Sequence, residues 1–285
     1  MEIPFRLVDV FTPVPMSGNQ LCVVPDPIDL NGSTMQALAK EIGFSETTFV
    51  TEAEGDRYAM RIFTPDAELP FAGHPTLGTA FVLVSEGRVT SPGTQRTTAG
   101  EVPVEVDVAS NSAWMTQLPV VFGRVFEDRA LIARAIGLEP DDLVSELPVQ
   151  TVTTGLLWTI VPVRDGARLG RAQRDGRALG EVAAISGDEG LYLFAVTGGG
   201  VTARMFDAGH GIGEDPATGS AAGPLGAYLA EHHLAGMPGS ILVRQGERVG
   251  RPSELLVEVR GERSGGWRVR VGGGVHVVGS GAFRL

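Results

Sequence analysis

One pattern of residues occurs twice in the chain, and this repeat constrains the fold more than any other feature of the sequence. Segment 61–63 leads through a loop into a helix start at 73–80, and segment 204–206 leads through a shorter loop into a helix start at 214–221. The alignment pairs Arg61 with Arg204, Phe63 with Phe206, His74 with Asp215, Pro75 with Pro216, Gly78 with Gly219, Thr79 with Ser220 and Ala80 with Ala221. Two copies a domain length apart predict duplicated halves whose helix N-termini face one cleft. The alternative is two unrelated helices, because short motifs of glycine, proline and alanine recur by chance.

The second copy shows why such a helix start suits a ligand. Pro216 fits a first helical turn, where its missing N–H is not needed, and Asp215 before it is a good N-cap residue. Small residues such as Gly219 and Ser220 let another backbone or a ligand approach closely. Free N–H groups and the positive dipole end of a helix attract anions. We therefore expect the helix starts to hold an anionic group.

Strand-like segments surround two apolar helices, which the sequence predicts over 75–86 and 217–232. A helix that is apolar on nearly every face must be covered on all sides. The flanking segments alternate as antiparallel strands do. We therefore predict an α+β fold of two pseudo-symmetric domains, each an antiparallel β-roll or barrel wrapped around a central helix. The 285 residues suit two domains, placed at 1–118 and 119–275, with a C-terminal strand at 276–285 returning to the first.

Composition excludes several classes of partner. The net charge of −11 argues against a nucleic acid or an anionic membrane surface. The chain shows no secretory signal and no apolar run of the roughly 18 residues that a membrane span needs. The single cysteine, Cys22, cannot form an internal disulfide, which favours a cytoplasmic location, and its apolar neighbours predict a buried strand position.

Motifs for metals and cofactors are missing. The five histidines (His74, His210, His232, His233 and His276) form no H-x-x-x-H pair, and no C-x-x-C occurs. The chain has no P-loop lysine, no dinucleotide fingerprint and no G-x-S-x-G nucleophile motif. A pyridoxal mechanism would have to use Lys40, the only lysine, which we expect to be solvated. We therefore expect neither a metal nor a cofactor.

Three side chains remain as candidates for acid–base chemistry: Glu46, His74 and Asp215. Glu46 lies between Phe44 and Phe49, and partial desolvation there would raise its pKa into the range of a working general base. Helix N-termini would hold a substrate carboxylate and stabilise an enolate-like charge beside it. The structural alternatives are a surface carboxylate for Glu46 and helix N-caps for the other two residues.

Several segments together resemble the phenazine-biosynthesis isomerase family (PhzF-like), which shares the diaminopimelate epimerase fold. The segments are 9–11, 18–19, 43–50, 61–65, 68–75 and 214–221, and the resemblance covers nearly the whole chain. It implies two halves with the active site between them, no cofactor and commonly a homodimer. It also implies that Glu46 is the acid/base that moves a proton between two carbons, assisted by His74 and Asp215. The substrate-binding residues would be Asn19, Ser45, Gly73, Gly219 and Ser220, the last four holding its carboxylate.

Two departures from the family pattern concern the pocket: Gln20 stands where proline is usual, and the loop 207–210 lacks an expected proline. Cysteines act as paired bases in the epimerase branch of the fold, and neither helix start here contains one. We therefore predict a cofactor-independent isomerase that shifts a proton along an allylic or dienyl system in a small carboxylate, a secondary-metabolite precursor. The alternatives are an amino-acid racemase or epimerase, or a non-catalytic small-molecule-binding protein.

Overall fold

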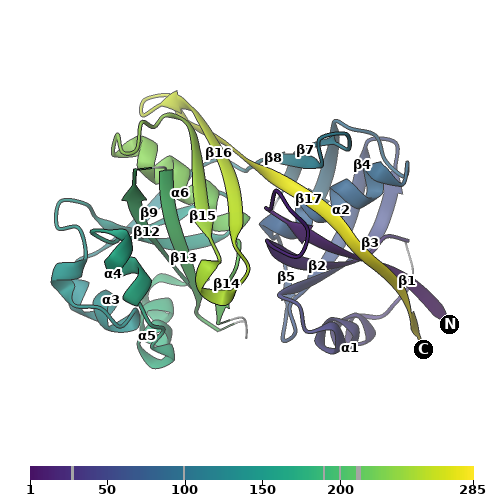
Figure 1. Ribbon diagram of the computed structural model, residues 1–285, viewed down its shortest axis with the longest axis horizontal. Helices are drawn as coiled ribbons and strands as arrows, with labels where there is room; N and C mark the ends of the chain where they lie inside the picture. The colour runs from purple at the N-terminus through teal and green to yellow at the C-terminus, as the bar shows by residue number, and fades with distance from the viewer. Residues whose placement is uncertain (27–28, 99, 189, 199, 210–212) are drawn as a thin grey trace.

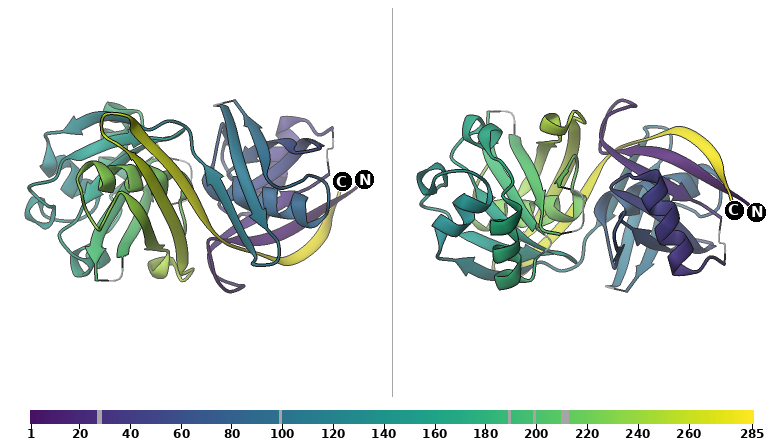
Figure 2. Two further views of the ribbon diagram at one scale, coloured as in Figure 1. Left: turned by 90° about the horizontal axis from the view of Figure 1, so that it is seen from above. Right: turned by 90° about the horizontal axis from the view of Figure 1, so that it is seen from below.

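The computed structural model describes residues 1–26, 29–98, 100–188, 190–198, 200–209 and 213–285. The chain forms two lobes side by side, which are distinct in all three ribbon views (Figures 1 and 2). The N-terminal lobe contains β1 (Glu2–Val10), β2 (Asn19–Val24), α1 (Gly32–Ile42), β3 (Glu46–Glu54), β4 (Arg57–Phe63), β5 (Glu68–Leu69), α2 (Gly73–Ser85), β6 (Gly93–Thr97), β7 (Gly100–Asp107) and β8 (Ser112–Thr116).

The C-terminal lobe has its own strands and central helix. It contains β9 (Val121–Phe126), α3 (Arg129–Ala135), the 3-10 turn η1 (Pro140–Asp142), β10 (Val149–Thr153), β11 (Leu157–Pro162), α4 (Gly166–Arg171), α5 (Gly176–Ser186), β12 (Gly190–Thr197), β13 (Gly200–Asp207), β14 (Glu214–Asp215), α6 (Gly219–Glu231), β15 (Gly239–Gln245), η2 (Glu247–Val249) and β16 (Ser253–Glu262). Most neighbouring strands are antiparallel, and in each lobe a parallel pair, β2–β3 or β11–β12, precedes the central helix.

The last strand, β17 (Gly266–Arg284), belongs to both lobes. It pairs first with β16, then with β8, and finally with β1, where Val275 to Arg284 run antiparallel to the first strand. Figure 1 shows it as the yellow strand that crosses the molecule and ends beside the N-terminus. Glycine is required at the crossing because a Cβ on Gly272 would lie 2.2 Å from the Trp114 ring. The domain boundary at 118/119 stays a prediction.

The central helices α2 and α6 are buried on nearly every side, and each has 13 residues. In α2 every residue from Gly73 to Leu83 is buried, and in α6 every residue from Gly219 to Ala230. This burial explains their apolar sequences, because strands cover each helix on all faces. The predicted α+β fold of two β-rolls around central helices is confirmed.

The two helix starts differ from the sequence expectation. Helix α6 begins at Gly219 after Thr218, so Asp215 is not its N-cap but lies in the short strand β14. Helix α2 begins at Gly73, and His74 is already inside its first turn. The proline signal was misread, because Pro216 precedes the helix whereas Pro75 lies within it.

An arginine–glutamate pair repeated in each lobe gives the correct alignment of the two halves. Arg61 bonds Glu68 through Nε and Nη2, each at 2.7 Å, and Arg204 bonds Glu214 in the same way at 2.8 and 2.7 Å. Each guanidinium also lies over the phenylalanine two residues further along its strand. Glu68 therefore corresponds to Glu214. The strand part of the predicted alignment holds, but its helix part is wrong: Gly73 corresponds to Gly219, and His74 to Ser220 rather than to Asp215.

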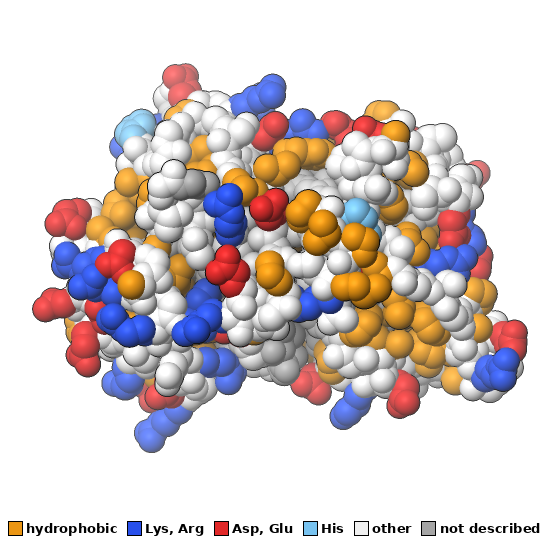
Figure 3. All heavy atoms as spheres, viewed as in Figure 1, with side chains coloured by type: hydrophobic (Ala, Val, Ile, Leu, Met, Phe, Trp, Pro, Cys, Tyr) orange, Lys and Arg blue, Asp and Glu red, His pale blue; other side chains and the backbone are white. Residues whose placement is uncertain are grey.

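The face of the molecule in Figure 3 shows no large area of basic side chains alone. On the face in Figure 3, acidic and basic side chains intermingle over the C-terminal lobe, consistent with a net charge of −11. Of the helices that the structure describes, none has the length and apolar character needed to pass through a membrane.

Candidate active site

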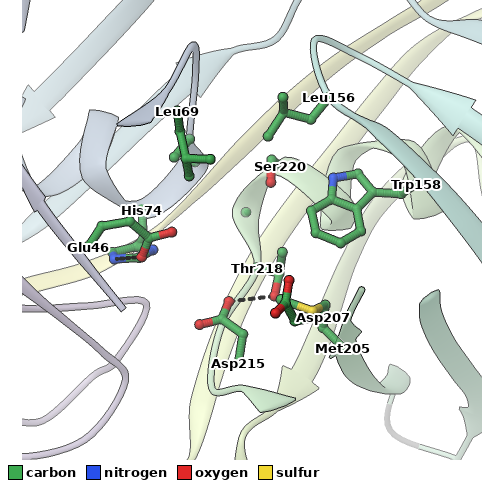
Figure 4. Close-up of a pocket in the computed structure, with 13 residues that line it drawn as sticks. Glu46, Leu69, His74, Leu156, Trp158, Met205, Asp207, Asp215, Thr218 and Ser220 are labelled. Atoms are coloured by element: carbon green, nitrogen blue, oxygen red, sulfur yellow. Dashed lines mark hydrogen bonds and ion pairs between the residues drawn. The ribbon is translucent and has the colours of Figure 1, made fainter. Parts of the chain in front are cut away.

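A pocket lies between the lobes, at the point where the starts of α2 and α6 meet. Figure 4 shows Glu46, Leu69 and His74 entering from the N-terminal lobe and the other labelled residues from the C-terminal lobe. The pocket is lined by Glu46, Leu69, Ala72, Gly73, His74, Leu156, Trp158, Met205, Asp207, Asp215, Thr218, Gly219 and Ser220. The expectation that the helix N-termini face a common cavity is therefore met by the geometry.

The two helix N-termini touch each other through glycine. A Cβ added to Gly73 would lie 2.5 Å from the amide nitrogen of Ser220 and 2.7 Å from Cα of Gly219. A Cβ on Gly219 would lie 2.7 Å from the ring of Phe11. Only glycine permits this approach, which brings the first-turn amides and the positive dipole ends of both helices to one place. That place suits a carboxylate or a developing negative charge.

Glu46 and His74 form a buried acid–base pair on the N-terminal side. Strand β3 begins at Glu46, and α2 carries His74 in its first turn, so rigid elements hold both side chains. Glu46 Oε2 lies 3.3 Å from His74 Nε2, and the two residues are only 7% and 3% exposed. Neither of these two atoms makes a well-formed hydrogen bond within the described part of the chain. Both are therefore available to a bound molecule.

The protonation of the two carboxyls is shifted toward the neutral form. Burial, together with the negative charges of Asp215 and Asp207, raises the pKa of Glu46 to about 8, against a hydrogen bond from Ser45. Burial likewise raises the pKa of Asp215 to about 7, with Asp207 acting in the same direction and two side-chain hydrogen bonds opposing. A carboxyl with such a pKa exchanges protons near neutral pH, which is what a general acid–base needs.

His74 is neutral, because burial lowers its pKa to about 3 against the opposing effect of the Gln20 backbone. Asn19 Nδ2 lies 3.0 Å from His74 Nδ1 and also donates to the backbone oxygen of Ala217 at 2.9 Å. The two hydrogens of Asn19 Nδ2 go to its two closer acceptors, Asp215 Oδ1 and the Ala217 carbonyl, so the contact with Nδ1 is a third and longer one. The other ring nitrogen, Nε2, faces Glu46 Oε2.

Asp215 enters from the opposite lobe and is held by a polar network. Asn19 Nδ2 donates to Asp215 Oδ1 at 2.8 Å, and Thr218 Oγ1 donates to Oδ2 at 2.6 Å. Gln245 donates to the Asp215 carbonyl at 2.8 Å and is itself bonded by Tyr192 at 2.9 Å. Asn19 thus connects His74 of one lobe with Asp215 of the other.

Most of the predicted site residues come together in the pocket. Six of them line it: Glu46, Gly73, His74, Asp215, Gly219 and Ser220. Asn19 and Ser45 lie behind this wall, where Ser45 Oγ donates to Asn19 Oδ1 at 2.7 Å. Asn19 is 1% exposed and contacts other side chains of the site, so its place is that of a positioning residue. The roles of all these residues toward a substrate stay predictions.

Sequence reasoning missed part of the wall, namely Leu69, Leu156, Trp158, Met205 and Thr218. These residues looked like ordinary strand or loop positions, since nothing in a single sequence tells which strand face turns to the pocket. Of the loop that departs from the family pattern, Asp207 lines the pocket, whereas His210 lies outside the described residues.

No metal site is evident, since the described residues contain no group of three or more His, Cys, Asp or Glu side chains placed to bind an ion. Cys22 is buried in β2, and burial raises the pKa of its thiol to about 12, so its thiolate is disfavoured. The expectation of a reaction without a cofactor stays a prediction.

The fold and the pocket define a class of two-lobed α+β enzymes with the active site between paired β-rolls. Within it, the chain belongs to the family described as phenazine biosynthesis-like protein (PhzC-PhzF), which matches residues 8–281. The crystal structure of a Bacillus anthracis phenazine biosynthesis protein of the PhzF family superposes with a TM-score of 0.88 at 28% identity, covering 100% of both chains. The resemblance inferred from the motifs is confirmed.

Two relatives agree on the class of reaction. The trans-2,3-dihydro-3-hydroxyanthranilate isomerase of Pseudomonas aeruginosa is 36% identical and covers 90% of each chain. An uncharacterized isomerase of Clostridium acetobutylicum is 34% identical over 95% of this chain and 94% of its own. The protein is therefore an isomerase, as the sequence predicted. Homodimer assembly and a cytoplasmic location remain predictions that rest on the resemblance and on the cysteine content.

Proposed function

We propose that the protein isomerises a small cyclic carboxylate by moving one proton between two carbons of an allylic or dienyl system, with Glu46 as the acid–base group. The observation that carries the proposal is the buried Glu46–His74 pair beside two facing helix N-termini. A carboxyl of raised pKa next to a site for a negative charge is what proton abstraction beside a carboxylate requires.

In the proposed reaction the substrate carboxylate sits against the first-turn amides near Gly73 and Ser220. The Glu46 carboxylate takes a proton from a saturated ring carbon, and the electron pair of that C–H bond enters the conjugated system. The helix amides stabilise the negative charge that reaches the carboxylate. On Glu46 the proton exchanges with solvent, and Glu46 then protonates a second carbon, so the double bond moves and no redox change occurs.

Neutral His74 supplies a hydrogen-bonding group that does not compete for the proton. With a pKa of about 3 it stays uncharged, so its Nε2 orients a polar substrate group without acting as a base. Asp215, from the other lobe, raises the proton affinity of Glu46 through its charge. The two carboxyls thus have unequal roles.

The substrate class comes from the P. aeruginosa relative, which is named for trans-2,3-dihydro-3-hydroxyanthranilate. We propose a substrate of this kind, a dihydro ring bearing a carboxylate and polar substituents. Its saturated ring carbon next to a conjugated system provides the acidic C–H bond that the mechanism needs.

The decisive test is exchange of the carbon-bound proton with solvent. We expect Glu46→Gln to abolish both turnover of trans-2,3-dihydro-3-hydroxyanthranilate and deuterium incorporation from heavy water, with a rate loss of about 10²–10⁴-fold. Binding should be largely kept, because glutamine has the size of the neutral acid. Proton NMR of the product reports the position of the double bond and of the deuterium.

Glu54→Gln is the matched control, since Glu54 is exposed at the far end of the same strand. Its rate should equal that of the unmodified protein. Exchange that persists in Glu46→Gln would refute the assignment of the base. A product with an inverted stereocentre and unmoved double bonds would favour the epimerase alternative. Binding without exchange in the unmodified protein would favour a binding protein.

A further inference from the structure

The corrected alignment of the two lobes shows what stands opposite Glu46. In β3, Thr47 pairs with Phe63, and Glu46 is the residue before Thr47. In β12, Leu191 pairs with Phe206, and Gly190 is the residue before Leu191. Gly190 therefore occupies in the C-terminal lobe the place of Glu46. Its φ of 152° favours glycine, and an added Cβ would lie 2.3 Å from the Phe206 carbonyl oxygen. The C-terminal lobe cannot carry a second acid at this place.

At four pairs of equivalent positions, one lobe has a polar side chain and the other has an apolar side chain or glycine. The pairs, with the polar member first, are Asn19 and Leu156, Glu46 and Gly190, Asp215 and Leu69, and Thr218 and Ala72. The backbone is duplicated, but at each of these places only one lobe has a polar group. The C-terminal lobe has its polar groups at Asp215 and Thr218, whereas Leu156, Trp158 and Met205 form an apolar wall of the pocket.

Trp158 is the largest side chain of this apolar wall. It lies on β11 beside Gly190, one residue before the parallel pair of Thr159 and Leu191. The indole is only 4% exposed and lines the pocket. Figure 4 shows the ring in the pocket, with its nitrogen edge on the side of Ser220.

The indole nitrogen of Trp158 has no hydrogen-bond partner among the residues that the structure describes. An unpaired N–H group that is buried costs free energy, and indole nitrogens in protein interiors usually have an acceptor. Leu156 and Met205 also line the pocket and give an apolar surface beside the ring. The wall thus presents one flat face and one free donor.

We propose that Trp158 is the specificity-determining residue of the proposed isomerase site, packing on the flat ring of the substrate and donating its Nε1–H to an acceptor on that ring. The proposal rests on the proposed function for the identity of the pocket. It commits to a substrate whose ring has a conjugated part that packs on the indole and a hydroxyl or amino acceptor, distinct from the carboxylate, on the side that faces away from Glu46.

The test uses 3-hydroxyanthranilate, the aromatic counterpart of the compound in the relative's name, which lacks the saturated carbon and cannot isomerise. The chain has three tryptophans, so ¹⁵N-labelled protein gives three indole N–H signals, and Trp158→Phe assigns one of them. We expect that signal to move downfield on addition of the probe. Trp158→Phe keeps an aromatic ring without the donor and should weaken binding about 5–10-fold, as expected for one neutral hydrogen bond.

Benzoate and Trp114→Phe are the controls. Benzoate lacks the ring substituents, so Trp158→Phe should change its affinity less than about twofold if the lost bond goes to a substituent. Trp114 lies on β8 beneath Arg270, outside the pocket wall, and its replacement should leave binding of both probes unchanged. An unmoved Trp158 signal on saturation, or equal losses for both probes, would overturn the proposal.

These outcomes are separate from those of the proposed function. An indole shift combined with exchange that survives Glu46→Gln would leave the recognition role standing and remove the assigned base. Lost exchange in Glu46→Gln combined with an unmoved indole signal would support Glu46 as the base and remove the recognition role of Trp158.

Discussion

Glu46 and Asp215 approach the pocket from different lobes, and the negative charge of Asp215 raises the pKa of Glu46. A general base acts only when it is ionised, so activity is lost as the pH falls below the pKa of Glu46. We therefore expect kcat/KM of the unmodified protein to rise with pH up to about 8, the pKa that the buried carboxyl has in the free protein.

Asp215→Asn should move this acidic limb to lower pH. The substitution removes the charge that disfavours the Glu46 anion, so the pKa of Glu46 falls toward its ordinary value and the base is ionised at lower pH. The measurement is the pH profile of kcat/KM. Thr218→Val is the comparison, because it keeps the Asp215 carboxyl and removes only a hydrogen bond that lowers its pKa, so the limb should move less than in Asp215→Asn. An unmoved limb in Asp215→Asn would show that the two carboxyls do not interact.

Residue types at the centre of the site were predictable, but their surroundings were not. A glutamate between two phenylalanines and a histidine at a helix start are visible in the sequence, and the structure places both in the pocket. The sequence predicts only a strand at Trp158, because the side of β11 that faces the pocket becomes visible only when the strands are paired and the lobes are placed together.

At the scale of elements, the contact between α2 and α6 is the feature that brings the amides together. Gly73→Ala would place a Cβ 2.5 Å from the Ser220 nitrogen, which is rigid backbone. We expect the helices to move apart, with a loss of about 1–3 kcal/mol in the free energy of unfolding and a larger loss of isomerase activity. Chemical denaturation and the exchange assay measure the two effects.

Gly78→Ala is the matched control in the same helix. Its Cβ would lie 2.6 Å from Cδ2 of Leu21, the end of a side chain that can shift. The added methyl group meets a contact of similar length in both variants, but in Gly78→Ala the contact between α2 and α6 is unchanged. Stability should fall in both variants, whereas activity should fall mainly in Gly73→Ala. Equal activity losses would mean that the helix contact has no special role.

The helices themselves were predictable from their sequence, and the alignment of the halves was not. Both central helices are apolar on all faces, a pattern that leaves few other folds. The alignment failed because prolines at 75 and 216 suggested equivalent helix starts. The true equivalence comes from Arg61 with Glu68 and from Arg204 with Glu214, contacts between strands that a linear comparison does not show.

At the scale of the whole molecule, β17 joins the lobes and completes the N-terminal one. A chain that ends at Gly274 would leave one edge of β1 unpaired along its whole length, with β2 as the remaining neighbour at positions 6–10. Unpaired strand edges expose backbone groups and promote aggregation. We expect this chain to lose cooperative unfolding and to bind a hydrophobic dye, measured by thermal denaturation and dye fluorescence. Removal of Leu285 alone is the control and should change neither. A cooperative, monodisperse truncated chain would contradict the expectation.

The asymmetry between Glu46 and Gly190 has a stereochemical consequence. If one carboxyl both removes and returns the proton, it reaches the substrate from one side only, because no mirrored group can stand at Gly190. The hydrogen must then leave and arrive on the same face of the ring, and the migration is suprafacial. A base in each of the two lobes could invert a stereocentre of the substrate, whereas a base in one lobe alone acts on one face of the ring.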